Sequence, residues 1–219
     1  MKKIALIALS VVGAGAHALV LDGFTGGSYN SGYISSGGAN GWQATATVVG
    51  GVRATYLGIL ANNEEEDARL RVRGVVSGGT YSVSAGPGVS VLAQVGYGFA
   101  VGSVSLGSND LNLDLTATND IRLNFLSNDL ALDTTVALYS NGALIGAQNK
   151  IVGGNANPFS ETFAFGGSGL SDVDQIVVSF FNSPSGDWAL SSVEAVPEPA
   201  SMAILGLGMA ALARRRNRK

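Results

Sequence analysis

Hydrophobic and polar residues alternate along much of the chain with a period of two. Within residues 42–49, the apolar Trp42, Ala44, Ala46 and Val48 fall on one face, and the polar Gln43, Thr45 and Thr47 fall on the other. The same alternation recurs in residues 68–76, 111–117, 120–126 and 188–195. Because successive side chains of a strand point to opposite faces, these segments are predicted to be half-buried β-strands.

Short runs rich in Val, Tyr and Phe add further predicted strands, in residues 54–60, 80–85, 89–95, 99–106, 135–140, 159–165 and 176–181. About a dozen short strands separated by turn residues favour an all-β protein, an antiparallel β-sandwich of jelly-roll type. Asn141-Gly142 suits the type I′ turn of a hairpin. The glycine-rich residues 23–41 are expected to form a loop or sheet edge, anchored by Phe24, Tyr29 and Tyr33.

Both ends of the chain depart from this pattern. Residues 1–18 combine a cationic start, an apolar stretch and the small-x-small sequence Ala16-His17-Ala18. This arrangement predicts a signal peptide that is cut after Ala18, with a weaker alternative cut after Ala16. The body is then residues 19–196, which is long enough to enclose a sizeable core.

The C-terminal segment begins with Pro197-Glu198-Pro199, which predicts a rigid extended joint. Residues 200–213 form an apolar run about 21 Å long as a helix, short against a hydrocarbon core of about 30 Å. Five of the last six residues are basic, including Arg214, Arg215 and Arg216. Positive charge on the cytoplasmic side predicts a short transmembrane helix with the body outside. A soluble amphipathic helix with a basic end is the alternative.

Composition limits the chemistry of the body. It holds six Lys and Arg against 15 Asp and Glu, a formal charge of −9, which argues against nucleic acid as a partner. The chain has no Cys, and its one His, His17, lies in the predicted signal peptide. A mature chain without either residue has no Ser-His-Asp triad and no Cys/His zinc or haem ligands. No cofactor is predicted, and stability is expected from core packing; bound calcium as a supplement stays an open alternative.

The two terminal segments together resemble one known family. Pro197-Glu198-Pro199, the apolar run 200–213 and Arg214 to Arg216, behind an N-terminal signal peptide, closely resemble the PEP-CTERM sorting signal of Gram-negative bacteria. The resemblance covers residues 197–219 and implies transient anchoring in the inner membrane and recognition by an exosortase-type membrane protease. It also implies association with extracellular polysaccharide and biofilm matrix. It concerns the address of the protein and leaves the activity of the body open.

Two charged clusters of the body have alternative explanations. The acidic run 64–67 could bind a cation or a basic partner, although such runs are usually solvated loops. Arg69, Arg71 and Arg73 share one face of a predicted strand and could bind carboxylates of an acidic polysaccharide. The plainer interpretation pairs them with acidic residues across the hairpin, including those of the acidic run.

Calcium and catalysis are the other chemistries that the carboxylates allow. Asp110-Leu-Asn112-Leu-Asp114 begins like an EF-hand loop, but Leu115 stands where Gly is needed and Ile121 where Glu is needed. A different calcium site remains open at Asp129, Asp133, Asp172 or Asp174. Glycoside hydrolysis needs two carboxylates around a cleft. The only glutamates of the body outside the acidic run are Glu161 and Glu194, so they are the first candidates for this pair of carboxylates.

Carbohydrate binding without catalysis is the leading specific hypothesis. Sugar recognition uses exposed aromatic rings with nearby polar groups, and the candidates are Tyr29, Tyr33 and Tyr97, together with Trp42 and Trp188. The two tryptophans begin alternating strands and are expected to pack in the core or at its rim. The sequence thus predicts a non-enzymatic, exported cell-surface or matrix protein, structural or adhesive, that associates with polysaccharide. The alternatives are a module for one defined glycan or a carboxylate-dependent glycoside-active enzyme.

Overall fold

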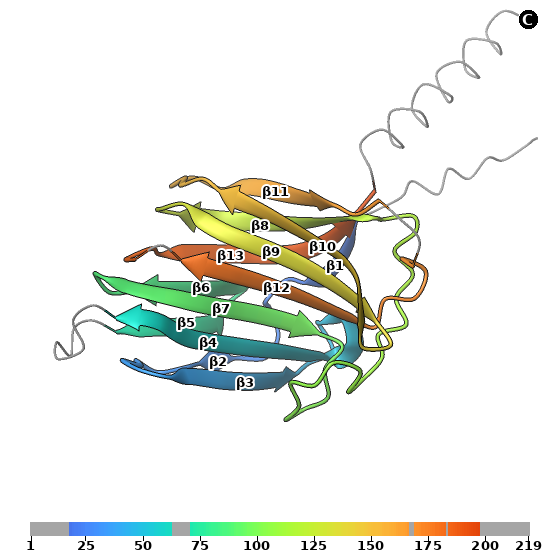
Figure 1. Ribbon diagram of the computed structural model, residues 1–219, viewed down its shortest axis with the longest axis horizontal. Helices are drawn as coiled ribbons and strands as arrows, with labels where there is room; N and C mark the ends of the chain where they lie inside the picture. Colours follow the sequence, from blue (N-terminus) through green and yellow to red (C-terminus); the bar gives the residue numbers. More distant parts are fainter. Residues whose placement is uncertain (1–17, 63–70, 167–168, 183, 198–219) are drawn as a thin grey trace, which may run out of the picture.

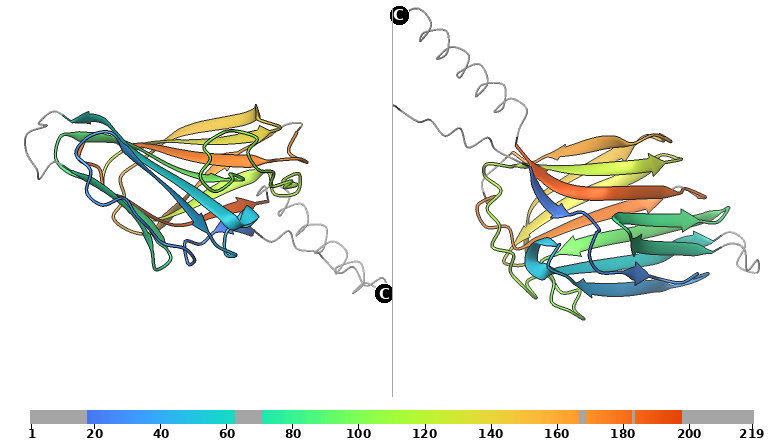
Figure 2. Two further views of the ribbon diagram at one scale, coloured as in Figure 1. Left: turned by 90° about the horizontal axis from the view of Figure 1, so that it is seen from below. Right: turned by 180° about the vertical axis from the view of Figure 1, so that it is seen from behind.

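The computed structural model describes residues 18–62, 71–166, 169–182 and 184–197. These residues form two antiparallel β-sheets packed face to face (Figures 1 and 2). The predicted all-β, jelly-roll-like sandwich is therefore confirmed. Among the described residues, no helix is long and apolar enough to cross a membrane. The predicted signal peptide up to His17, which includes Ala16, lies outside the described part. The tail from Glu198 onward, which includes Pro199 and Arg214 to Arg216, also lies outside it.

The six-stranded sheet has the order β10-β9-β12-β7-β4-β3 and faces the viewer in Figure 1. Its strands are β3 (Gly38–Ala44), β4 (Val52–Asn62), β7 (Val89–Tyr97), β9 (Leu132–Ser140), β10 (Ala143–Val152) and β12 (Gln175–Asn182). A short 3₁₀ helix, η1 (Val49–Gly51), leads into β4.

The seven-stranded sheet has the order β11-β8-β13-β6-β5-β2, with β1 beside β13. Its strands are β1 (Leu19–Asp22), β2 (Tyr29–Asn30), β5 (Val72–Ser77), β6 (Thr80–Ala85), β8 (Asp120–Asn128), β11 (Phe159–Ala164) and β13 (Trp188–Val196). Leu19 pairs with Ala195, so the start of the first strand lies beside the end of the last strand.

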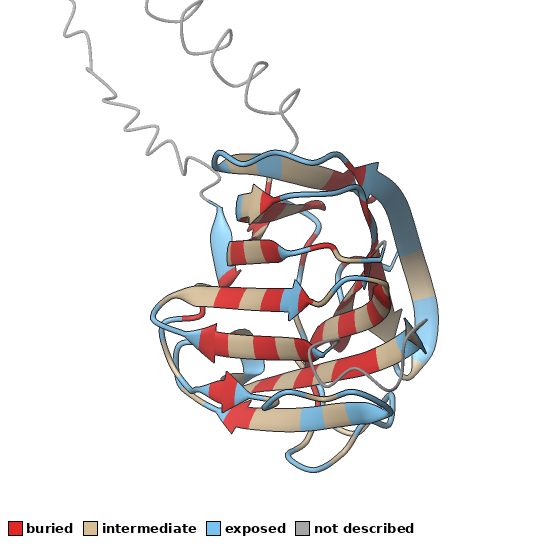
Figure 3. Ribbon diagram, turned by 90° about the vertical axis from the view of Figure 1, so that its left-hand side faces the viewer, coloured by how far each residue is buried: buried red, intermediate tan, exposed pale blue. Residues whose placement is uncertain are grey.

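The core lies between the sheets and is built from alternate residues of each strand, as the period of two predicts (Figure 3). In β7, for example, Val89, Val91, Ala93 and Val95 are fully buried, while the residues between them are partly exposed. The predicted hairpin is also present, because Asn141 and Gly142 both adopt positive φ between β9 and β10.

Two of the predicted strands are wrong. Residues 99–106 and 111–117 belong to the long connection from β7 to β8, where Leu113 makes only an isolated bridge with Val173. Gly98, Gly102 and Gly107 have positive φ and turn the chain repeatedly, so no regular ladder forms. Leu115 is nevertheless buried in the core. The alternation of leucines in this connection reflects packing without strand pairing.

Two other segments differ in part from prediction. The strand expected over 42–49 runs instead over Gly38–Ala44 and ends before the turn that leads to η1. In the glycine-rich segment, Phe24 and Tyr29 are buried anchors, as expected. Tyr33 is 64% exposed and anchors nothing, because its side chain lies on the surface.

Candidate functional site

A groove of about 220 Å³ opens on the outer face of the six-stranded sheet. Strands β3, β4, β7, β9 and β12 supply its floor, and the β7–β8 connection supplies one wall. The lining residues are Asn40, Trp42, Ala54, Thr55, Tyr56, Gln94, Gly96, Phe99, Val104, Leu106, Tyr139 and Val177. Four of them are aromatic, two are amides and none is charged.

Strand register places Trp42 in a row with three smaller residues on one face of the sheet. Trp42 pairs with Ala54, which pairs in turn with Gly96 and Val177 through successive strands. Side chains at paired positions share a face, so the large indole lies at the end of a row of small residues. This row leaves the space of the groove beside the indole.

The neighbouring row is polar. Asn40 pairs with Tyr56, Tyr56 with Gln94, and Gln94 with Ser179. The Gln94 amide donates a hydrogen bond from Nε2 to Ser179 Oγ at 2.9 Å, which fixes the orientation of the amide. The floor thus presents an apolar row and a hydrogen-bonding row side by side, which is the combination that a sugar with polar hydroxyls and apolar C–H faces requires.

Glycines create the room in which the rings lie. A Cβ at Gly96 would lie 2.7 Å from the Phe99 ring, and one at Gly58 would lie 2.2 Å from the Tyr56 hydroxyl. The Tyr56 ring also passes over Gly38 on β3, where a Cβ would lie 2.9 Å away. Any larger residue at these positions would displace the ring above it, so the glycines hold Phe99 and Tyr56 close against the sheet.

The wall of the groove is tied down at two points. Trp42 Nε1 donates a hydrogen bond to the Ser103 carbonyl at 3.0 Å. The buried Gln175 donates from Nε2 to the carbonyls of Gly98 and Asn109, at 3.1 and 3.4 Å. These bonds hold both ends of the wall segment against the sheet, so the groove is preformed.

Two of the three predicted tyrosine platforms are not exposed, and the prediction of exposed rings there is wrong. Tyr97 is fully buried, and its hydroxyl donates to Asp22 Oδ2 at 3.4 Å. Tyr29 is 8% exposed and donates to the Ala39 carbonyl at 3.1 Å. Burial raises the pKa of Tyr29 to about 12 and, with the Asp22 charge, raises that of Tyr97 well above its usual value. Both point inward because their strand positions alternate with the outward ones.

The remaining aromatic candidates divide between surface and core. Trp188 is buried, as expected, and donates from Nε1 to Asn182 Oδ1 at 2.7 Å. Trp42 is partly exposed at the rim and lines the groove. Tyr33 is exposed on the other sheet, with the Arg73 guanidinium 5.4 Å from its ring centroid. The groove therefore uses Trp42 together with Tyr56, Phe99 and Tyr139, which the sequence did not single out.

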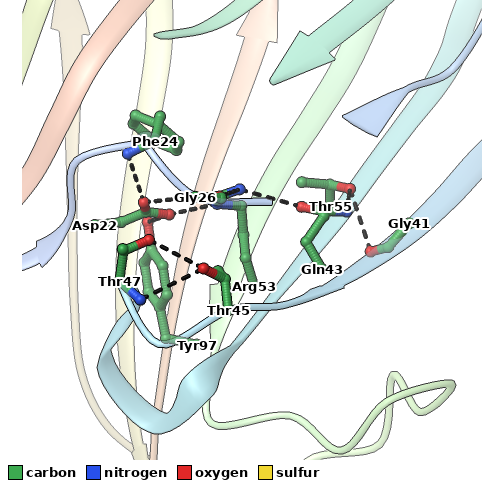
Figure 4. A network of polar contacts seen from close by, with 10 residues as sticks. All are labelled: Asp22, Phe24, Gly26, Gly41, Gln43, Thr45, Thr47, Arg53, Thr55 and Tyr97. Carbon is green, nitrogen blue, oxygen red and sulfur yellow. Dashed lines mark hydrogen bonds and ion pairs between the residues drawn. The ribbon is translucent and has the colours of Figure 1, made fainter. Parts of the chain in front are cut away.

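A polar network centred on Asp22 and Arg53 lies inside the sandwich (Figure 4). Arg53 donates from Nε and Nη2 to the two carboxylate oxygens of Asp22, at 2.5 and 2.6 Å. Its Nη1 donates to the Gly26 carbonyl at 3.2 Å, and the guanidinium lies 5.0 Å from the Phe24 ring centroid. Both charged side chains are completely buried. The ion pair therefore joins the two sheets and is closed to a ligand.

The suspected carboxylate pair is not formed. Glu161 aligns with Leu123 on the core-facing side of the seven-stranded sheet, while Glu194 aligns with Arg122 on the outer side. Glu194 binds Arg122 Nη2 at 2.5 Å, and Glu161 lies 3.9 Å from Lys150 Nζ. Since the two glutamates face opposite sides of one sheet, they do not flank a common cleft.

Three of the four aspartates proposed for calcium have separate hydrogen-bond partners. Asp129 Oδ1 accepts from the Asp187 main-chain N–H at 2.7 Å, and Asp174 Oδ2 accepts from that of Asn141 at 2.6 Å. Asp133 accepts from the Asn149 amide. Over the described residues, no three Asp, Glu, His or Cys side chains gather into a potential metal site. Calcium binding stays a prediction.

Comparison with known proteins identifies the C-terminal segment. Residues 195–219 match the family model of the PEP-CTERM protein-sorting motif. The chain therefore carries this motif, which indicates export and sorting to the cell surface. The predicted resemblance is confirmed. Comparison with curated proteins gives no match.

Comparison with solved structures finds similarity to several chains. One is a family 11 carbohydrate-binding module of a cellulosomal cellulase of Clostridium thermocellum, at 14% identity, with a TM-score of 0.41 over 84% of this chain and 96% of that chain. Another is the CBM27-1 module of Caldicellulosiruptor saccharolyticus in complex with mannohexaose, at 14% identity, with a TM-score of 0.36 over 83% and 98% of the two chains. These likenesses are too distant to assign a ligand to this chain.

Proposed function

We propose that this protein is an exported surface or matrix protein whose body binds a neutral polysaccharide in the groove of the six-stranded sheet. The observation that carries the proposal is the lining of the groove, with Trp42, Tyr56, Phe99 and Tyr139 beside the amides of Asn40 and Gln94. Aromatic rings bury the apolar faces of sugars, and amides donate to and accept from their hydroxyls.

The lack of charge in the lining favours an uncharged ligand. The body is strongly acidic overall, yet every lining residue of the groove is neutral. A ligand without charge buries there with no unpaired ion, whereas a uronate would find no cation to pair with its carboxylate. The groove is therefore proposed to take neutral hexose units of a polysaccharide.

A non-enzymatic role fits the same lining. Hydrolysis of a glycosidic bond uses two carboxyl groups beside the bond, and the groove lining contains none. Glu161 and Glu194 lie on different faces of the other sheet. We therefore propose retention of polysaccharide, in a structural or adhesive role, in place of turnover.

The tail directs the protein to the site of this role. Strand β13 ends at Val196, inside the start of the matched motif 195–219, and Pro197 follows directly. In the proposed sequence of events, the tail anchors the protein transiently in the inner membrane until an exosortase-type protease acts near Pro197-Glu198-Pro199. The body then reaches the cell surface or the biofilm matrix, where polysaccharide is abundant.

The test is a titration of the exported protein with soluble neutral oligosaccharides, including cellohexaose, laminarihexaose and mannohexaose. We expect binding of at least one, with Trp42→Ala and Tyr139→Ala each weakening it about tenfold, since a stacked ring supplies on the order of 1 kcal/mol beyond its buried area. Tyr33→Ala removes an exposed ring outside the groove and serves as the matched control, with unchanged affinity expected.

Two results would count against the proposal. One is binding that the groove substitutions leave unchanged while the variants keep their unfolding temperatures, because the ligand would then lie elsewhere. The other is release of reducing sugar that disappears in Glu161→Gln or Glu194→Gln. That result would establish the enzyme alternative.

A further inference from the structure

A second surface, on the opposite sheet, combines an exposed ring with positive charge. Ile34 bridges Val72 through hydrogen bonds in both directions, at 3.0 Å each, which places Tyr33 opposite Arg73. Tyr33 is 64% exposed, and Arg73 lies on the outward side of β5, between buried residues. The Arg73 guanidinium carbon is 5.4 Å from the Tyr33 ring centroid. The ring and the cation thus form one exposed unit.

The position of Arg73 is fixed by its neighbours. Its Nε donates to Asn30 Oδ1 at 3.1 Å, and the same oxygen accepts from the Gly32 main-chain N–H at 3.0 Å. Only Nε is used in these contacts, so the two Nη groups remain available to an incoming carboxylate. A guanidinium held at one end is preorganised for a two-point contact with such a group.

The distribution of charge sets this surface apart. Arg53, Arg122 and Lys150 each form an ion pair with a carboxylate of the body. Within the described residues, Arg71 and Arg73 are the cationic side chains without such a pair, and both lie on one extended segment. In a body of charge −9, the available positive charge is therefore concentrated beside Tyr33. Arg69 and the acidic run 64–67 lie outside the described residues.

We propose that Tyr33, Arg73 and Arg71 form a binding site for an acidic sugar, a hexuronate unit of a polysaccharide. The phenol ring packs against the apolar face of the sugar, and the guanidinium groups bind its carboxylate. This site lies on the outer face of the seven-stranded sheet and is independent of the groove. With both sites occupied, one molecule joins a neutral chain to an acidic chain, which is a cross-linking function in a matrix.

The experiment is calorimetric titration of the exported protein with trigalacturonate in the presence of EDTA. We expect Arg73→Gln and Tyr33→Ala each to weaken binding about tenfold, and raised salt to weaken it as well. Methyl-esterified trigalacturonate keeps the rings and loses the charges, so it should bind at least about tenfold more weakly. Because Tyr33 is exposed, Tyr33→Ala should keep the unfolding temperature of the parent.

Matched controls separate this site from general charge and from the groove. Lys150→Gln removes one positive charge elsewhere, and Trp42→Ala alters the groove, so both should leave the affinity for trigalacturonate unchanged. Equal affinity for the methyl ester, equal loss in Lys150→Gln or absence of any binding would overturn the proposal. Displacement by equimolar inorganic phosphate would also overturn it and indicate a simple anion site.

Discussion

Asp22 and Arg53 join the two sheets of the sandwich through a two-point ion pair from which solvent is completely excluded. Asp22 ends β1 of the seven-stranded sheet, and Arg53 lies near the start of β4 in the six-stranded sheet. Asp22 Oδ1 also accepts from the Phe24 main-chain N–H at 2.7 Å. Each buried charge depends on its partner, because either one alone would remain desolvated without an opposite charge beside it.

Removal of one partner should therefore be far more costly than removal of both. We expect Arg53→Met to lower the free energy of unfolding by about 3 to 5 kcal/mol, since it leaves Asp22 buried and unpaired. The double variant Asp22→Asn with Arg53→Met should recover part of this loss. Urea unfolding of the parent, the two single variants and the double variant measures the coupling. A double variant less stable than Arg53→Met would show that Asp22 is stabilised by its other partners.

Three buried tyrosines predict a loss of stability at alkaline pH. The pKa of Tyr29 is raised to about 12, and those of Tyr81 and Tyr97 are raised well above the usual value of a tyrosine, mainly by burial. The folded protein keeps these protons above pH 10, about where the unfolded chain releases them, so stability is full below that pH and falls as pH rises.

The slope of this loss should approach about 1.4 kcal/mol per pH unit for each tyrosine. Urea unfolding between about pH 9 and 12 measures it, and Tyr97→Phe should flatten the profile by one such contribution. Tyr33→Phe is the control, because it removes the hydroxyl of an exposed tyrosine and leaves the three buried ones in place. A profile that is flat through this range would contradict the burial of the three hydroxyls.

Gly98 and Gly102 have nearly the same backbone conformation in very different surroundings. Their φ values are +80° and +82°, but a Cβ at Gly98 would lie 2.0 Å from the Asp174 carbonyl oxygen, while nothing lies within 4 Å at Gly102. Gly102→Ala should cost about 1 kcal/mol, from its backbone conformation alone. Gly98→Ala adds a backbone clash and should cost about 3 kcal/mol or more. Thermal unfolding compares the pair, and equal losses would contradict the close approach of the β12 end.

The alternation of hydrophobic and polar residues predicted the sandwich because most strands have one buried and one more exposed face. Residues 80–85 were predicted as a strand with the bounds that the structure has, and residues 188–195 fall one short of β13. The β7–β8 connection misled the prediction, since Leu111, Leu113 and Leu115 alternate to fill the core beside turns at positive-φ residues. The local alternation of hydrophobic and polar residues indicates which side chains are buried. It does not show whether a segment has a neighbouring strand to pair with.

The candidate site was harder to predict than the fold. The position of Tyr97 in step with Val91, Ala93 and Val95 could have indicated its burial. Tyr56 lies between Thr55 and Leu57 in a strand that has small residues on both faces. The sequence of this strand alone therefore does not show which face points outward. Its neighbours in the groove come from distant strands, and their register is set by tertiary packing. The four aromatics of the groove therefore gather only in three dimensions.

The first strand predicts the N-terminal cut. Leu19 is the first residue of β1 and pairs with Ala195, and the buried Leu21 follows two residues later. A cut after Ala18 leaves this strand whole, so the mature protein is expected to begin at Leu19. Edman sequencing of exported material tests this expectation. A start at His17 would point to the weaker site after Ala16, and a start at Met1 would contradict the signal peptide.

The last strand limits where the tail can be cut. Strand β13 lies between β8 and β6 and is paired up to Val196, which is 7% exposed and pairs with Asp120. A cut within β13 would remove a central strand, so the exported protein should end at or after Val196.

Replacing Pro197-Glu198-Pro199 by three alanines should leave an unprocessed, membrane-bound form, and deleting residues 214–219 should disturb orientation or retention. Intact mass spectrometry of the extracellular and membrane fractions measures each case. A freely soluble mature form that keeps residues 214–219 would contradict processing of this tail.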